Sequence, residues 1–141
     1  RACRRRDAFA GRFAKLSQTE VTAVDFDGSA SLGLGRGALA RVLQRGLQPG
    51  TVLFCSSDQF AQGLLVEAAA RGMSIPGDIA IIGFGDQEFA ASTEPALTSI
   101  RIDRHILGER AANALIERFS GAAGAETVHD VGFELVRRAS A

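Results

Sequence analysis

The sequence has little cysteine and no net charge, and both features limit the classes of protein to which it can belong. Its two cysteines, Cys3 and Cys55, form no Cys-x-x-Cys pair and lie near no histidine at metal-ligand spacing. We therefore expect two free thiols, with Cys55 buried at the end of an apolar run, and no metal site. Basic and acidic residues balance at 16 each, so no overall charge draws the chain towards nucleic acid or a membrane surface.

Long hydrophobic runs and the motifs of common enzymes are also missing. No apolar stretch approaches the ~20 residues that a membrane-spanning helix needs. There is no Gly-x-Ser-x-Gly motif, and no histidine lies near Ser56 or Ser57 in the sequence. Residues 33–38, GLGRGA, match a dinucleotide-binding pattern, but six residues separate them from the preceding apolar run, where that motif requires a tight turn. We therefore expect no catalytic residue and no cofactor.

What the chain does have is an alternation of short apolar runs with longer amphipathic segments. Short apolar runs predict strands, and apolar residues at helical spacing predict helices. The predicted strands are 21–26, 51–55, 79–84 and 97–102, the predicted helices are 2–17, the second half of 31–46, 57–71 and 104–119, with Asp103 as the cap of the last, and residues 127–140 are predicted as two short strands. This order predicts an α/β fold in which a parallel sheet carries helices on both faces, as one domain or one lobe of a larger domain.

Serine, glycine and acidic residues gather where three of the predicted strands end. The segments are DFDG (25–28), CSSD (55–58) and GFGD (83–86). Ligands of open parallel sheets bind outside the carboxyl ends of the strands, so these segments predict a ligand site. Serine and aspartate at the same places also cap helices, and the residues by themselves leave both interpretations open.

Several longer motifs resemble the carboxyl-terminal half of LacI/GalR-type transcriptional repressors. They are SSD at 56–58, RGMSIPGDIAIIGF at 71–84, PALTSI at 95–100 and ELVRRAS at 134–140. The resemblance covers nearly the whole chain and implies a parallel-sheet lobe of the periplasmic-binding-protein-like type I fold. Residues 1–141 would then be a fragment of the effector-binding and dimerisation domain, mainly its carboxyl-terminal lobe, in a cytoplasmic regulator.

The same resemblance implies what the rest of such a regulator would contain. The chain starts without methionine inside a predicted helix, so we expect the first lobe and an amino-terminal helix-turn-helix head, which would contact operator DNA, to lie outside this sequence. The intact protein would sense a sugar or sugar acid. The alternative is a periplasmic sugar-binding protein of the same fold that serves transport.

The resemblance also implies which residues contact the effector. Arg5, four positions before Phe9, would reach effector hydroxyls or carboxylates, a bidentate task that suits a guanidinium group. Phe26 would stack on the effector, and Ser57 would offer a polar contact. Asp58 would either contact the effector or cap the following helix.

The segment GFGD departs from the pattern of the family. Family members have two aspartates after the aromatic residue, and the first binds sugar hydroxyls; here Gly85 precedes Asp86. A carboxylate facing an anionic ligand would be repulsive and costly to desolvate. Its loss, with Arg5 retained, favours an acidic effector and resembles regulators of gluconate-type sugar acids. Alternatively, Gly85 only relaxes a turn.

The helix at 57–71 resembles the segment that helps to form the dimer interface in this family. Gln62 and Val66 are expected to point outward from it, close to Phe89 and Thr93 in the segment 89–94. A two-fold interface of this kind would place two DNA-binding heads on two half-sites of an operator, so the resemblance implies a homodimer.

Overall fold

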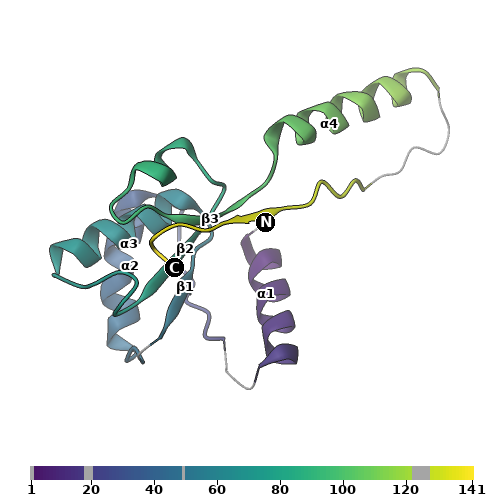
Figure 1. The fold of residues 1–141 in the computed structure, drawn as a ribbon. Helices are drawn as coiled ribbons and strands as arrows, with labels where there is room; N and C mark the ends of the chain where they lie inside the picture. The colour runs from purple at the N-terminus through teal and green to yellow at the C-terminus, as the bar shows by residue number, and fades with distance from the viewer. Residues whose placement is uncertain (1, 18–20, 49, 122–127) are drawn as a thin grey trace.

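The computed structural model describes residues 2–17, 21–48, 50–121 and 128–141 and shows an α/β lobe with one helix extending from it (Figure 1). The elements in chain order are α1 (Ala2–Leu16), α2 (Leu32–Gln44), β1 (Val52–Phe54), α3 (Asp58–Ala70), β2 (Ala80–Phe84), the 3-10 helix η1 (Glu88–Ser92), β3 (Thr98–Arg101), α4 (Arg104–Phe119) and β4 (Glu134–Val136). Most of these elements lie where the sequence predicts them.

Four strands form one sheet in the order β1-β2-β3-β4. The first three are parallel, with Leu53 opposite Ile81 and Gly83 opposite Ser99, and β4 runs antiparallel to β3. The predicted parallel sheet is confirmed for β1, β2 and β3, while the antiparallel β4 makes the whole sheet mostly parallel. Because β1, β2 and β3 run in one direction, their carboxyl ends meet at one edge of the sheet.

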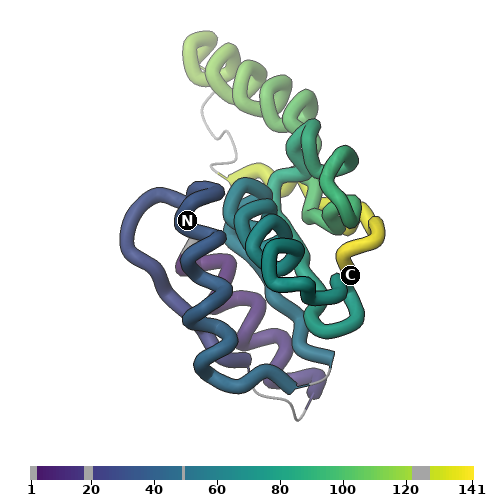
Figure 2. The backbone as a smooth tube through the Cα atoms, turned by 90° about the vertical axis from the view of Figure 1, so that its left-hand side faces the viewer, coloured from purple at the N-terminus to yellow at the C-terminus, as the bar shows by residue number. Residues whose placement is uncertain are grey.

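Helices α2 and α3 lie side by side on one face of the sheet (Figure 2). They approach closely at two glycines: a Cβ atom at Gly35 would strike the backbone oxygen of Phe60, and one at Gly63 would strike the backbone oxygen of Leu32. The segment GLGRGA therefore lies inside α2, capped by Ser31. The prediction that only the second half of 31–46 is helical is wrong, because these glycines allow two helices to pack.

The hydrophobic core fills the space between this helical layer and the sheet. Leu39 of α2, Leu64 of α3 and Ile81 of β2 are almost completely buried there, and Leu97 closes the core just before β3. Burying one leucine side chain of this kind contributes about 1.5–3 kcal/mol, so the core is the main source of stability for the lobe.

Helix α1 lies on the opposite face of the sheet. The ring of Phe9 packs 5.0 Å from that of Phe54 and 5.7 Å from that of Phe13, measured between centroids. The guanidinium carbon of Arg5 lies 3.9 Å from the centre of the Phe84 ring. Helices therefore lie on both faces, as predicted, and α1 brings an arginine to the end of β2.

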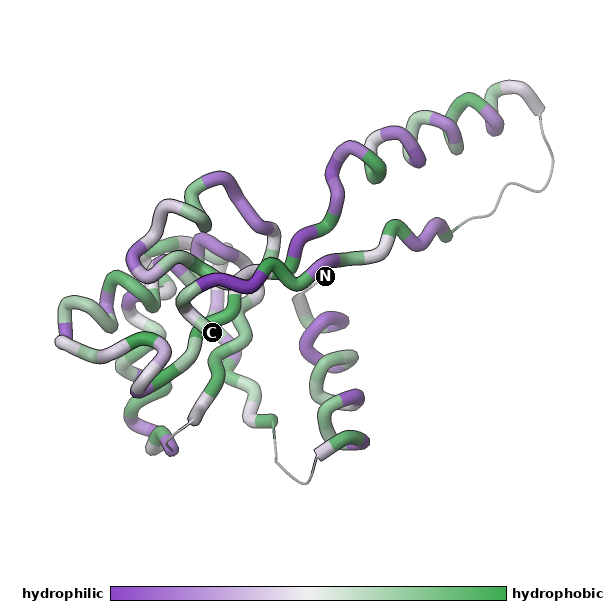
Figure 3. Tube along the Cα trace, in the orientation of Figure 1, coloured by the Kyte–Doolittle hydropathy of each residue, from purple (hydrophilic) through white to green (hydrophobic). Residues whose placement is uncertain are grey.

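Helix α4 extends away from the lobe (Figure 1). Asp103 caps it as predicted, because its Oδ1 accepts hydrogen bonds from the backbone N–H groups of His105 at 2.9 Å and Ile106 at 3.1 Å. Apolar and polar residues alternate along the helix (Figure 3), but its apolar side is not covered: Leu115 is 56% and Phe119 is 87% exposed. Among the described residues, no part of the lobe buries this helix.

Two strand predictions are wrong. Residues 21–26 are irregular, although their composition is that of a strand, because no strand pairs with them in the described part of the chain. Instead, the Arg45 side chain donates to the backbone oxygen of Ala23 at 3.1 Å. Of the two strands predicted within 127–140, the structure has only β4, and residue 127 lies outside the described residues.

Replacing Leu64 by alanine tests where the stability of the lobe comes from. Leu64 is 2% exposed, so Leu64→Ala should lower the free energy of unfolding by about 2–5 kcal/mol. The matched change Leu115→Ala on the exposed side of α4 should alter it by less than about 0.5 kcal/mol. Urea unfolding of the chain measures both values. Equal losses would mean that α4 is packed on the lobe in solution.

Candidate functional site

The ends of β1 and β2 lie side by side at the carboxyl edge of the sheet, as the sequence predicts. The link is Asp58 at the start of α3, whose Oδ2 accepts a hydrogen bond of 2.6 Å from the backbone N–H of Gln87. Gly83 packs directly against the same carboxyl group, and a Cβ atom at this position would strike Asp58 Oδ1. A glycine is therefore required at 83 for this close approach.

Ser57 and Asp58 have different environments although they are neighbours. Ser57 is the N-cap of α3, and its hydroxyl accepts from the backbone N–H of Phe60 at 3.3 Å. Asp58 is completely buried, and its Oδ1 accepts a hydrogen bond of 2.6 Å from the hydroxyl of Ser99. The capping interpretation thus holds for Ser57, whereas Asp58 joins α3 to the sheet.

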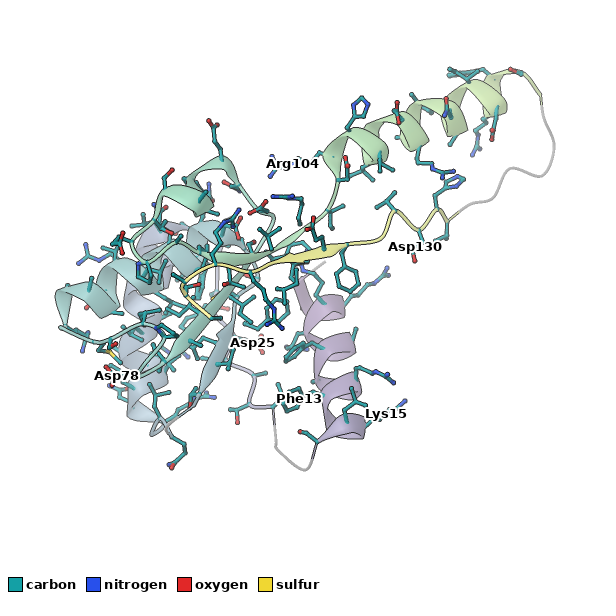
Figure 4. All side chains as sticks on the ribbon, in the orientation of Figure 1. Phe13, Lys15, Asp25, Asp78, Arg104 and Asp130 are labelled. Atoms are coloured by element: carbon teal, nitrogen blue, oxygen red, sulfur yellow. The ribbon has the colours of Figure 1, made fainter. Side chains whose placement is uncertain are left out.

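The loop after β2, residues 85–87, has an unusual backbone conformation. Gly85 has a φ of +125° and Asp86 a φ of +44°, a region in which side chains other than glycine are strained. Arg104 lies at the base of α4 (Figure 4). Its side chain donates to the backbone oxygen of Gly85 at 2.8 Å. The positive φ explains why a glycine stands at position 85. The same glycine also leaves this position without a carboxylate.

Asp86 lies at the centre of an ion-pair network. Its Oδ2 accepts from Arg101 Nε at 2.7 Å, and its Oδ1 lies 2.7 Å from Arg138 Nη1. Arg101 also pairs with Glu134 of β4 at 3.3 Å. Burial raises the pKa of Asp86, but its ion pairs with Arg138 and Arg101 outweigh this effect and hold the pKa below its usual range. The network ties the loop to β3 and to the residues after β4.

Arg5 reaches the same edge from α1. Its Nη2 donates to the backbone oxygen of Ser56 at 2.9 Å, while its guanidinium plane lies over Phe84. A guanidinium group has five N–H donors, and this hydrogen bond is the only one that Arg5 makes to the described residues. Arg5 therefore has donors left for an acceptor on a ligand.

Phe26 lies in a different set of contacts. Its ring is 5.5 Å from that of Phe60 in α3, and the guanidinium group of Arg41 in α2 lies 4.6 Å above it. The described contacts therefore tie Phe26 to the helical layer and not to Arg5.

Three of the four residues predicted for the dimer interface meet in one surface groove. Gln62 and Val66 of α3 line it together with Thr93, which follows η1; the other lining residues are Leu65, Ala69 and Glu94. Phe89 lines a neighbouring hollow with Arg104, Gln87, Glu88 and Ser92. The predicted proximity of residues 89–94 to α3 is confirmed, although Phe89 lies outside the groove itself.

The partners of the site residues could not be read from the sequence. Ser99 lies in the PALTSI motif and Arg138 in ELVRRAS, but the motifs alone did not show that these side chains bind Asp58 and Asp86.

The cysteines are free, as predicted. Cys55 is buried, and burial, with the nearby charge of Asp58, raises the pKa of its thiol to about 12. That thiol is therefore protonated at neutral pH.

Residues 2–17, 21–48, 50–121 and 128–141 lack two further kinds of feature. No helix there is long and apolar enough to cross a membrane. No group of three or more histidine, cysteine, aspartate or glutamate side chains there is arranged to hold a metal ion.

Comparison with known proteins identifies the family of the chain. The chain belongs to the periplasmic binding protein-like domain family, because the sequence model of that family matches residues 2–141. Its relatives are LacI-type transcriptional regulators, as the sequence motifs predict. The HTH-type transcriptional regulator GntR of Pseudomonas aeruginosa is 39% identical over 111 residues, which are 79% of this chain and 32% of that protein.

Solved structures agree with this assignment. Transcription regulator GntR from Chromobacterium violaceum superposes with a TM-score of 0.86 at 30% identity, over 99% of this chain and 51% of that one. A LacI family transcriptional regulator from Arthrobacter sp. FB24, in complex with lactose, superposes with a TM-score of 0.78 at 25% identity, over 95% and 49%. The chain thus spans about a third of the first curated relative and about half of these solved chains. Because these relatives are transcriptional regulators, a regulatory role is favoured over a role in transport or in catalysis.

Changing Asp86 to asparagine tests the ion-pair network. The folded-state pKa of Asp86 is lowered, so its pairs stabilise the fold above the unfolded-state pKa of about 3.9 and lose their effect as the pH falls below that value. Asp86→Asn should therefore cost about 1.5–3 kcal/mol of unfolding free energy at pH 7, and the difference from wild type should shrink below about pH 4. Urea unfolding across this pH range measures it.

Asp27→Asn is the matched control, because Asp27 is exposed and makes no ion pair with the described residues. It should change the unfolding free energy by less than about 0.5 kcal/mol at either pH. An Asp86→Asn effect that stays constant from pH 7 to pH 3 would contradict the role of its charge.

Proposed function

We propose that this chain is the small-molecule-sensing and dimerisation part of a LacI-type DNA-binding transcriptional regulator. The observation that carries the proposal is the match of residues 2–141 to a binding-protein-like domain, in a chain whose relatives are regulators. The chain supplies mainly the carboxyl-terminal lobe of the sensing domain. The first lobe and a helix-turn-helix head that binds operator DNA belong to the intact regulator, which acts in the cytoplasm.

The effector is a sugar acid of the aldonate class, held at the carboxyl edge of the sheet. Arg5 supports this choice, since its remaining N–H donors can bind a carboxylate. The loop supports it as well: position 85 carries no carboxylate, and the carboxyl groups of Asp58 and Asp86 are occupied by partners within the chain. Ser57, the N-cap of α3, and Phe26, which packs against Phe60 and Arg41, are further proposed contacts of the effector. A related regulator in complex with lactose supports a sugar-sized ligand.

Regulation follows from a shift between two arrangements of the lobes. An effector that binds both lobes favours the arrangement in which it makes more contacts, and the DNA-binding heads follow that arrangement. The coupling free energy is limited by the difference in effector affinity between the two states. Contacts at the Gly85 loop are suited to this task, because Arg101 ties that loop to β3 and Arg104 ties it to the base of α4.

Replacing Arg5 tests the effector class. Isothermal titration of the intact regulator should detect binding of D-gluconate and much weaker binding of D-glucose, since the neutral sugar lacks a carboxylate for Arg5. Arg5→Ala should weaken gluconate binding by about 10- to 100-fold, the loss expected for hydrogen bonds to a charged group. Arg12→Ala, an exposed change on the same helix, is the control and should leave the affinity unchanged.

Tight binding of glucose without binding of gluconate or another aldonate would contradict the effector class. Unchanged gluconate affinity in Arg5→Ala would contradict the role of Arg5.

The groove beside α3 is proposed as the homodimer interface, formed by Gln62, Val66 and Thr93 with Phe89 at its border. In the intact regulator, Val66→Glu should raise the dimer dissociation constant at least about tenfold, because it places a charge in a buried contact. Val52→Glu is the control, since Val52 is also an exposed valine, at 54% against 40% for Val66, and it does not line the groove. Sedimentation equilibrium measures both. An unchanged dimer in Val66→Glu, or equal weakening in both variants, would exclude this interface.

A further inference from the structure

Two fully buried polar side chains, Asp58 and Ser99, meet beneath the loop that follows β2. They come from different elements, α3 and β3, and lie 41 positions apart in the sequence. Polar groups without solvent contact are costly unless they are hydrogen-bonded. The partners of this pair are therefore the key to what it does.

The pair accepts hydrogen bonds from two consecutive backbone N–H groups of the loop. The N–H of Asp86 donates to Ser99 Oγ at 3.1 Å, and the Ser99 hydroxyl donates in turn to Asp58 Oδ1 at 2.6 Å. The N–H of Gln87 donates to Asp58 Oδ2 at 2.6 Å. Both oxygens of the Asp58 carboxyl group are thus used, and the donor and acceptor functions of the Ser99 hydroxyl are both used.

These bonds determine the position of the loop. Gly85 and Asp86 have positive φ values, so this turn is costly for the backbone and persists only where its surroundings hold it. The missing Cβ atom of Gly83 lets the carboxyl group of Asp58 approach the end of β2 closely enough to reach the loop. On the outer side, Arg101 and Arg104 complete the attachment.

We propose that Asp58 and Ser99 are positioning residues that set where the Gly85–Asp86 segment stands, and that they act on effector binding through this segment. The inference rests on the proposed function for its effector. Asp58 has 0% of its surface exposed, so a ligand at the edge meets the loop and Arg5 but not the carboxyl group of Asp58. Asp58 and Ser99 would thereby control which ligands fit at the carboxyl edge of the sheet without contacting those ligands.

A matched pair of serine-to-alanine variants tests the proposal. Ser140 is also fully buried, and its hydroxyl likewise accepts from one backbone N–H, that of Thr98 at 2.9 Å, and donates to one oxygen, that of Ile81 at 2.6 Å. Ser99→Ala and Ser140→Ala therefore remove the same group and the same number of hydrogen bonds. Only Ser99→Ala removes a hydrogen bond from the loop, the one donated by the Asp86 amide.

The first measurement is amide hydrogen exchange by NMR on the 141-residue chain, which requires no effector. Ser99→Ala should speed exchange at the Asp86 amide about tenfold relative to core amides such as that of Leu64. The reason is that the Asp86 amide loses its hydrogen-bond acceptor while the core stays folded. Exchange at the Gln87 amide should also rise. In Ser140→Ala these two amides should change only as much as the core does. A uniform change across the chain in Ser99→Ala, or the same loop effect in Ser140→Ala, would overturn the proposal.

The second measurement is the affinity of the intact regulator for D-gluconate. Ser99→Ala should weaken gluconate binding about tenfold, whereas Ser140→Ala should leave it within about twofold. If wild type binds gluconate and Ser99→Ala binds it equally well, the pair does not position the effector site and the proposal fails. If wild type binds no aldonate, the proposed effector class fails instead, and the exchange rates still decide whether the pair holds the loop.

Discussion

The buried carboxyl group of Asp58 joins parts of the chain that are far apart in the sequence. Ser99 donates to one of its oxygens and the Gln87 amide to the other, while Gly83 packs against its side. The start of α3, the end of β2, the strand β3 and the loop 85–87 therefore share one polar group. Because a buried polar group must keep its partners, the parallel register of these strands and the conformation of the loop are determined together.

A second carboxyl group completes the same edge from outside. Asp86 pairs with Arg101 and Arg138, which brings β3 and the residues after β4 to the loop. Both carboxyl groups are occupied inside the chain, whereas Arg5 still offers N–H donors at this edge. A ligand that reaches Arg5 would meet a positive charge, and this links the packing of the lobe to the proposed preference for an acidic effector.

Much of the fold could be predicted because local patterns carry it. The strand predicted at 79–84 and the helix predicted at 104–119 agree with β2 and α4 to within a residue, and Ser57 and Asp103 cap their helices. The strand predicted at 21–26 is wrong, since a strand exists only where another strand pairs with it. The sequence predicts a helix only in the second half of 31–46, but the glycines of GLGRGA lie inside α2, where they are needed for the close packing of α2 against α3.

The sequence by itself determined the order of the elements, the helix caps and the family, because each depends on residues that are neighbours along the chain. The tertiary structure alone decided that Asp58 faces inward to Ser99, that Arg5 reaches the end of β1, and that Asp86 is paired. These contacts join residues 13 to 52 positions apart, and such pairs are created by the register of the sheet and the packing of helices on its two faces. A local pattern contains no information on which distant donor meets which acceptor, so the roles of these residues emerge only in the folded chain.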